Sequence, residues 1–185
     1  ALKNSLRQRP DVILIGEIRA REVMEQALTI AETEHICLAT LHTTNAYQAI
    51  ERIVNFFPEE QHHQIRLNLS MNLKAIISQR LIPSIEGALV PAIEIMINEA
   101  LIRELIEEGR YDKVSEVMEK NTNIGMQTFD QSLLALYTNG LISEDTVLNQ
   151  SDKASDIKVK LQQMKMGQSS GSLQNMDTSL LKVSD

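Results

Sequence analysis

Several features that define common classes of protein are scarce or missing in this sequence. It contains one cysteine, Cys37, which excludes an intrachain disulfide and a zinc knuckle and fits a reducing, cytoplasmic environment. It has no run of about 18 apolar residues, the length that a membrane-spanning helix needs, so we expect no membrane insertion. Basic residues are outnumbered, 18 against 25 acidic ones, and the net charge of −7 argues against nucleic acid as a partner.

A phosphate-binding loop is also missing. In P-loop NTPases this loop is rich in glycine and ends in lysine, yet none of the seven glycines here is followed by lysine. If the chain is part of such an enzyme, the loop must lie upstream of Ala1, and the chain alone is not expected to bind ATP well. The start of the sequence resembles neither a signal peptide nor an initiator segment, so we expect a piece of a longer protein.

The pattern that is present is typical of an α/β fold. Hydrophobic residues make up 43% of the 185 residues, which is enough to form a core. Residues 12–15 predict a strand buried on both faces of a parallel sheet, residues 21–33 a helix, and residues 36–41 a second strand. A helix that joins two parallel strands indicates an α/β sheet, in which ligands bind beyond the carboxyl ends of the strands.

The rest of the chain is predicted to form a hairpin followed by helices only. Asn45 is placed to begin a helix, and a second helix is expected over 59–80. Strands are expected at 81–83 and 90–97, around a turn. The later helices are short and predict a small bundle, and the polar composition from Gly167 predicts a disordered tail.

Glu17 directly follows the first predicted strand. A carboxylate in this place can orient or deprotonate water beside a phosphate, because the strand fixes it in position. The alternative is an acid that simply faces solvent at the end of a strand. The sequence pattern by itself leaves both interpretations open.

His42 follows the second predicted strand and is succeeded by Thr43 and Thr44. The ring can reach toward the same crevice as Glu17, while the hydroxyl groups and the start of the next helix favour an anion. This arrangement suits a phosphate sensor. The alternative is a histidine of a capping loop that bonds to the backbone.

The other histidines do not converge on a metal site. His35 lies about 23 Å from His42 if the segment between them is extended. His62 and His63 are adjacent on a predicted helix and point about 100° apart. We therefore expect no metal site in this chain.

Two segments resemble the motifs of a known ATPase family. Residues 6–19, Leu-Arg-Gln-Arg-Pro-Asp-Val-Ile-Leu-Ile-Gly-Glu-Ile-Arg, closely resemble the Walker B region of the type II/IV secretion and type IV pilus ATPases. Residues 31–33 and 39–46 resemble the His box of the same family. The resemblance implies that Glu17 activates the attacking water and that His42 contacts the γ-phosphate side of the nucleotide.

Three shorter segments resemble the retraction branch of this family, PilT and PilU, with PilU the more similar. They are Asn68–Ser70, Ile77–Leu81 and Gly125–Asp130, and the likeness extends from Ala1 to about Leu161. Assembly-type motors usually carry a tetracysteine zinc element, which one cysteine cannot form. The resemblance implies the C-terminal fragment of a hexameric ATPase that powers type IV pilus retraction and twitching motility.

The resemblance also implies an architecture and partners. Residues 1–98 would form the C-terminal half of a RecA-like P-loop NTPase core, 99–165 a helical subdomain, and 166–185 a disordered tail. The implied partners are further copies in a homo-hexamer, a PilT-type paralogue and the inner-membrane pilus platform protein. The implied location is the cytoplasm, peripheral to the inner membrane at the base of the pilus machine.

Gly16, Arg19 and Thr43 are implied to lie near the nucleotide. Gly16 occupies the place where other P-loop enzymes have a metal-binding Asp, so ATP and Mg²⁺ would be held mainly by the upstream half. Ala20 stands where many relatives have Asp. Arg19 is expected either to reach a phosphate or carboxylate at the subunit boundary or to pair with Glu22.

A further segment resembles the helix that PilT-like proteins need for retraction. Its motif residues are Leu101, Ile102, Arg103, Leu105 and Ile106, while Glu107 stands at the later basic position. If the apolar stripe of this helix is exposed, an adaptor that docks on a partner ATPase is the better interpretation, whereas burial indicates core packing. An assembly-type secretion ATPase is the other alternative, which the cysteine count weakens.

Overall fold

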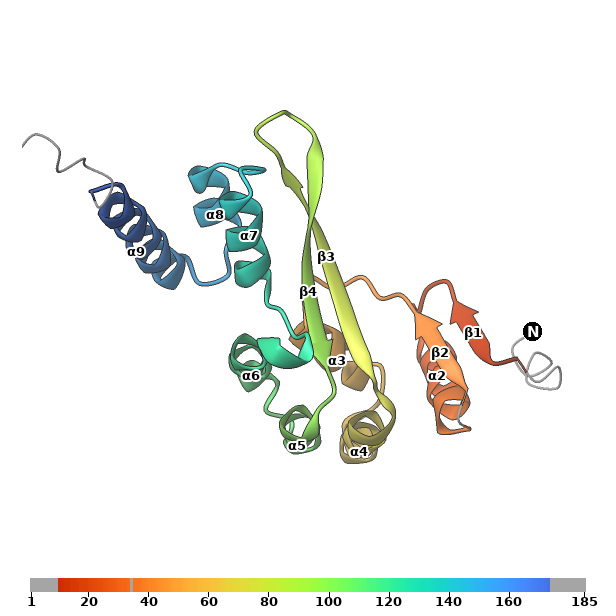
Figure 1. The fold of residues 1–185 in the computed structure, drawn as a ribbon. Coiled ribbons are helices and arrows are strands. Elements are labelled where there is room, and N and C mark those ends of the chain that lie inside the picture. Colours follow the sequence, from red (N-terminus) through yellow and green to blue (C-terminus); the bar gives the residue numbers. More distant parts are fainter. Residues whose placement is uncertain (1–9, 34, 174–185) are drawn as a thin grey trace, which may run out of the picture.

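The computed structural model describes residues 10–33 and 35–173 (Figure 1). Its elements are, in order, β1 (Val12–Ile15), α2 (Arg21–Glu32), β2 (Ile36–Ala39), α3 (Ala46–Asn55), η2 (Glu59–Gln61), α4 (His62–Asn72), β3 (Ala75–Pro83), β4 (Leu89–Ile97), α5 (Ala100–Glu108), η3 (Tyr111–Lys113), α6 (Val114–Lys120), η4 (Thr122–Ile124), α7 (Phe129–Thr138), α8 (Glu144–Gln150) and α9 (Ala154–Leu173). Within these ranges, every helix is too short or too polar to span a lipid bilayer. The α/β class expected from the sequence is confirmed.

β1 and β2 form a parallel pair joined by α2, as the sequence predicts. The register runs from Val12 opposite Ile36 to Ile15 opposite Ala39. One face of the pair packs on α2, where Ile13 and Ile15 join the buried core. Because the strands are parallel, both carboxyl ends lie at the same edge of the sheet.

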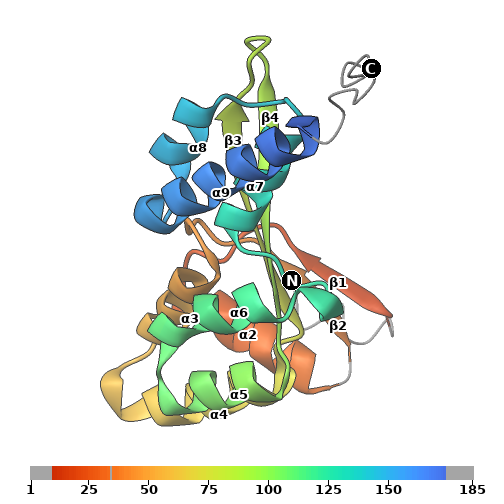
Figure 2. The ribbon, with the colours of Figure 1, turned by 60° about the vertical axis from the view of Figure 1, so that its left-hand side comes forward.

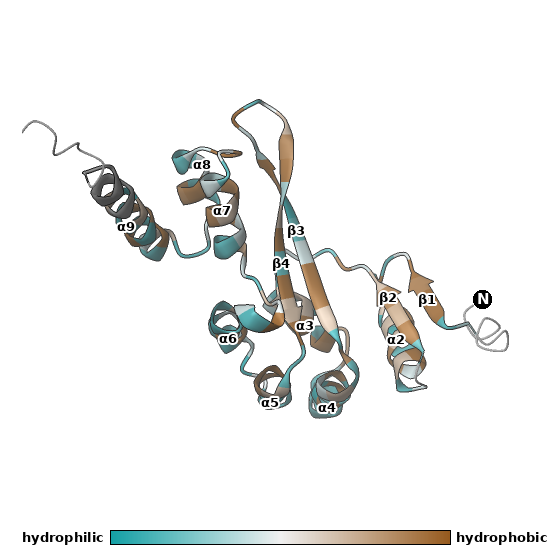
Figure 3. Cartoon of the chain, in the orientation of Figure 1, coloured by the Kyte–Doolittle hydropathy of each residue, from teal (hydrophilic) through white to brown (hydrophobic). Residues whose placement is uncertain are grey.

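The prediction that β1 is buried on both faces is wrong for this chain. Leu14 is 72% exposed and Leu38 53% exposed, and Val12 and Ile36 lie on the same open face. Figure 3 shows both strands as apolar ribbons, although only one face carries a helix layer in the described part of the chain. Alternate side chains of a strand point to opposite faces, so a strand covered on one side leaves every second residue in solvent.

β3 and β4 form a long antiparallel hairpin, separate from the first pair. The helix predicted over 59–80 ends at Asn72, so the assignment of residues 75–80 to a helix is wrong. Leu73 already has extended backbone, with ψ of 135°, and β3 then pairs along its whole length with β4. This pairing satisfies the backbone groups of a β-branched segment, which overrides the helical periodicity read from the sequence.

The hairpin contributes to two hydrophobic clusters. Figure 2 shows α7, α8 and α9 beside one half of the hairpin and α3 to α6 beside the other. The first cluster unites β1 with α2 to α6 and includes Ile50, Met96 and Ile106. The second packs α7, α8 and α9 against Ile82 and Ala92 of the hairpin. Since α5 and α6 share the first cluster, a domain boundary at residue 98 stays a prediction.

Two helix ends show specific capping interactions. Thr128 and Gln131 form a reciprocal capping box at the start of α7. Gly109 ends α5 with φ of 76°, a left-handed conformation that favours glycine.

The last described helix is longer than the sequence predicts. α9 continues to Leu173, so a disordered tail that begins at residue 166 is wrong for residues 166–173. Ile157 and Leu161 anchor the first half of this helix in the second cluster, and adding residues to an anchored helix is easier than starting a new one. The rest of the predicted tail, 174–185, lies outside the described residues.

Candidate functional site

The candidate site lies at the carboxyl ends of β1 and β2. Two contacts connect the segments that leave these strands: the amide of Ile18 donates to the carbonyl of Thr40 at 3.0 Å, and the Thr40 hydroxyl donates to the carbonyl of Gly16. Glu17 and His42 are thereby brought to adjacent positions, as their places at the strand ends predict.

Three side chains meet at Glu17. Nε2 of His42 lies 2.7 Å from Oε1 of Glu17, and Nη2 of Arg19 lies 2.6 Å from Oε2. The ring of His42 therefore contacts a carboxylate, and its role is not limited to bonding the backbone of its own loop. Arg19 pairs with Glu17, a partner that the sequence did not indicate, and not with Glu22; a contact of Arg19 with phosphate or with a neighbouring subunit stays a prediction.

The electrostatics of this cluster favour an ionised carboxylate. The pKa of Glu17 is lowered from its ordinary value, chiefly by the hydrogen bond from Arg19, with further contributions from the charges of Arg19 and His42. Glu17 keeps 22% of its side chain exposed, whereas the side chains of Arg19 and His42 are each 77% exposed. The guanidinium of Arg19 and the imidazole of His42 thus project from the carboxylate into open space, where a ligand can reach them.

One oxygen of Glu17 lies against the imidazole of His42. Oε1 is closed off from solvent, and Nε2 of His42, 2.7 Å away, is the polar group that faces it, although the angle is poor for a hydrogen bond. A shielded carboxylate oxygen normally has a partner. His42 is therefore the partner of this oxygen.

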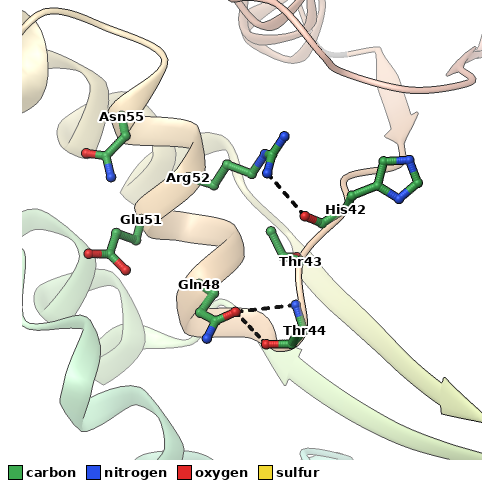
Figure 4. Close-up of a pocket in the computed structure, with 7 residues that line it drawn as sticks. All are labelled: His42, Thr43, Thr44, Gln48, Glu51, Arg52 and Asn55. Atoms are coloured by element: carbon green, nitrogen blue, oxygen red, sulfur yellow. Dashed lines mark hydrogen bonds between the residues drawn. The ribbon is translucent and has the colours of Figure 1, made fainter.

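The backbone of the His42 segment is held by α3 (Figure 4). Nη1 of Arg52 donates to the carbonyl of His42 at 3.3 Å, and the Thr44 hydroxyl donates to Gln48. The imidazole points away from α3, as Figure 4 shows, so the helix anchors the loop while the ring is left to contact Glu17. The concave surface between loop and helix has a volume of about 310 Å³ and is lined by His42, Thr43, Thr44, Gln48, Glu51, Arg52 and Asn55.

The start of α3 fixes the other end of this loop. Asn45 caps the helix, because its side chain accepts from the amide of Gln48 at 3.0 Å, as the sequence predicts. The carboxyl group of Glu94 on β4 is a second acceptor, which takes a hydrogen bond of 2.7 Å from the amide of Ala46. Sequence reasoning missed Glu94 and Arg52, although a charged residue between Ala92 and Met96 in an apolar strand was a signal for a buried polar contact.

The predicted retraction helix lies apart from the candidate site, on α5 (Figure 1). Ile102, Leu105 and Ile106 are buried in the first cluster, and only Leu101 of the stripe is exposed, at 50%. Arg103 donates to the carbonyl of Asn98 at 3.1 Å. The stripe is therefore a core contact, and the exposure that would favour an adaptor is not found.

The described residues offer no ready site for a metal ion. No group of three or more His, Cys, Asp or Glu side chains gathers among residues 10–33 and 35–173. Arg19 and His42 already surround Glu17, and Glu51 lines the hollow from α3. Gly16 contributes a carbonyl that is bonded to Thr40, and no side chain.

Comparison with known proteins gives a consistent family assignment. The family model described as "Type II/IV secretion system protein" matches residues 1–137. The type IV pilus ATPase PilU of Pseudomonas aeruginosa is 49% identical over 162 residues, which cover 87% of this chain and 42% of PilU. The PilT retraction ATPase of the same organism is 44% identical over 145 residues, or 78% of this chain and 42% of PilT.

Solved structures agree with this assignment. A crystal structure of the pilus retraction motor PilT with bound ADP matches with a TM-score of 0.75 and 42% identity, over 84% of this chain and 43% of that one. The ATPase DotB of Legionella pneumophila matches with a TM-score of 0.68 and 26% identity, over 79% of this chain and 40% of that one. The chain thus spans about two fifths of the length of these relatives. The family model covers most of the sequence, so the resemblance seen in the Walker B and His-box segments is confirmed and the chain belongs to the type II/IV secretion system protein family.

Proposed function

We propose that this chain completes the nucleotide site of a hexameric ATPase and that the full-length protein hydrolyses ATP to drive type IV pilus retraction. The observation that carries the proposal is the meeting of Glu17 and His42, 2.7 Å apart, at the carboxyl ends of two parallel strands. The names of the similar proteins, a pilus ATPase and a retraction motor with bound ADP, support nucleotide hydrolysis in a pilus motor.

In the proposed mechanism Glu17 orients and deprotonates the attacking water. Its lowered pKa keeps the carboxylate ionised, so that Glu17 can accept a hydrogen bond from water. Arg19 and His42 hold the carboxylate in place, and His42 presents a hydrogen-bonding group toward the phosphates. Both groups are open to solvent here, which leaves room for the nucleotide and a neighbouring domain.

Mg²⁺ would neutralise charge on the phosphates during hydrolysis, and upstream residues would hold it together with ATP. This division of labour is supported by the lack of a cluster of metal-binding side chains among the described residues and by the missing glycine-rich loop. Thr43, at the rim of the hollow beside His42, is placed to bind a phosphate oxygen. The partners in this proposal are other copies in the hexamer, a PilT-type paralogue and the inner-membrane platform protein, with the motor in the cytoplasm at the base of the pilus.

The direct test is the ATPase activity of the full-length protein with Glu17→Gln. Turnover is expected to fall by a factor on the order of 10² to 10⁴, because the amide cannot take a proton from water. Glu22→Gln is a matched control, since Glu22 is an exposed acid in the first turn of α2. Turnover should be measured with and without the PilT-type paralogue, and a Glu17→Gln rate equal to that of the unchanged protein in both conditions would refute the proposal.

A further inference from the structure

Glu94 is a charged residue in the core of the molecule. It lies on β4 between Ala92 and Met96, which share its face of the hairpin and are fully buried, and it is itself only 4% exposed. A carboxyl group in such surroundings needs hydrogen-bond partners to offset the loss of water. The partners of Glu94 therefore indicate why this position is polar.

The main partner of Glu94 is the first turn of α3. Oε1 accepts a hydrogen bond of 2.7 Å from the amide of Ala46, the first residue of the helix, 48 positions away in the sequence. The free amides and the positive end of a helix favour an acceptor there. Asn45 already satisfies the amide of Gln48, so Glu94 supplies a second cap that comes from a different element of the fold.

The neighbouring strand, β3, also contacts the segment that leads into α3. Nε of Arg80 on β3 donates to the carbonyl of Thr44 at 3.4 Å. Arg80 and Glu94 lie on one face of the hairpin, since Ser78, two residues before Arg80, stands opposite Glu94 in the register. The hairpin thus holds the chain on both sides of Asn45, through a carbonyl before it and an amide after it.

These contacts, at Thr44 and Ala46, lie two and four residues from His42. The carbonyl of His42 is in turn held by Arg52, which belongs to α3. The position of His42 is therefore determined by where α3 begins, and Glu94 fixes that point relative to the rigid hairpin.

We propose that Glu94 is a positioning residue that sets the location of His42 by holding the N-terminus of α3. The assignment rests on the role proposed above for His42 in hydrolysis. Glu94 does not touch the nucleotide, so it acts on the rate only through the loop that carries the imidazole.

The test uses the full-length protein and separates rate from binding. Glu94→Ala is expected to lower kcat by roughly ten- to a hundredfold with little change in the KM for ATP, because a small displacement of a reacting group mainly affects the transition state. Glu94→Gln should restore most of kcat, since its amide oxygen still accepts from Ala46. In a protein that already carries His42→Ala, Glu94→Ala should cause no additional loss.

Ser132→Ala is the matched control. The Ser132 hydroxyl accepts a hydrogen bond of 3.0 Å from the amide of Ile93. This variant therefore removes a hydrogen bond of β4 one residue away from Glu94 and leaves the contacts of α3 unchanged. It is expected to keep kcat and to leave the amide exchange of Ala46 unchanged, whereas Glu94→Ala should accelerate that exchange. Equal kcat losses for Glu94→Ala with and without His42 would overturn the proposal, because the effect would then not pass through the imidazole.

Glu94→Asp keeps the test decisive if the alanine variant does not fold. The shorter Asp side chain keeps a carboxyl group but moves its acceptor oxygen away from the amide of Ala46. The kcat of Glu94→Asp should therefore be lower than that of Glu94→Gln. The reverse order would contradict the proposal. Amide exchange of Ala46 is independent of hydrolysis. If His42→Ala leaves turnover unchanged, the role of His42 fails. Unaltered exchange at Ala46 in the Glu94 variants would overturn the positioning contact itself.

Discussion

The carboxyl groups of Glu17 and Glu94 lie in two contrasting regions of the same fold. Glu17 stands at the open end of the parallel strands beside the exposed side chains of Arg19 and His42, and its pKa is lowered, chiefly by the hydrogen bond from Arg19. Glu94 lies inside the hairpin, and burial raises its pKa above the ordinary value despite the hydrogen bond from Ala46. We call the surroundings of Glu17 the open region and those of Glu94 the closed region. The open region exposes side chains that can bind a ligand, whereas the closed region holds the N-terminus of α3 in place.

The largest effect is expected from removing the side chain of His42, because Glu17 contacts its ring and Glu94 is proposed to position its loop. Its replacement by alanine should lower kcat by about 10² or more while the affinity for ATP changes little, because an interaction made in the transition state acts on the rate. Steady-state kinetics and equilibrium nucleotide binding of the full-length protein measure both quantities.

His63→Ala is the control for this experiment, since His63 is exposed on α4 and lies outside the candidate site. It should leave both quantities unchanged. If His42→Ala weakened ATP binding and spared kcat, His42 would be a binding residue, and Glu94 would then position a binding group.

The open region was largely predictable from the sequence. Glu17 and His42 follow strands with clear apolar runs, and the geometry of a parallel pair brings the ends of its strands together. The cap at Asn45 is equally local, because donor and acceptor are three residues apart. The family motifs added the roles of these residues, which spacing alone left open.

The closed region was not predictable, and the reason is distance along the chain. The bond between Glu94 and Ala46 spans 48 residues, and it exists only because β3 is a strand. The sequence of residues 75–80 fits a helix equally well until its partner strand is known. Contacts that depend on such pairing cannot be read from local periodicity.

The two faces of the β1–β2 pair provide a second, smaller contrast. Ile13 is 6% exposed and Leu14 is 72% exposed, although the two are adjacent. Ile13→Ala should reduce the free energy of unfolding of this chain by about 2 to 4 kcal/mol, since it leaves a cavity. Leu14→Ala should change it by less than about 0.5 kcal/mol.

Chemical denaturation of both variants measures this difference. Both variants should also be measured in the full-length protein. If Leu14→Ala becomes as destabilising there as Ile13→Ala, upstream residues cover the exposed face of the β1–β2 pair. A large effect of Leu14→Ala in this chain alone would contradict the exposure of that face.

The smallest expected effect comes from Arg19→Ala, and it concerns pH more than rate. Arg19 is the main cause of the lowered pKa of Glu17, so without it that pKa rises toward its ordinary value. The ionised form then requires a higher pH, and the acid limb of the kcat profile of the full-length protein should shift upward. At neutral pH Glu17 stays ionised, and kcat should remain within about fivefold, the range that a weak exposed ion pair allows. Arg110→Ala, which breaks the exposed pair with Glu108, should leave the profile in place; a large loss for Arg19→Ala at neutral pH would instead mean that Arg19 contacts the nucleotide directly.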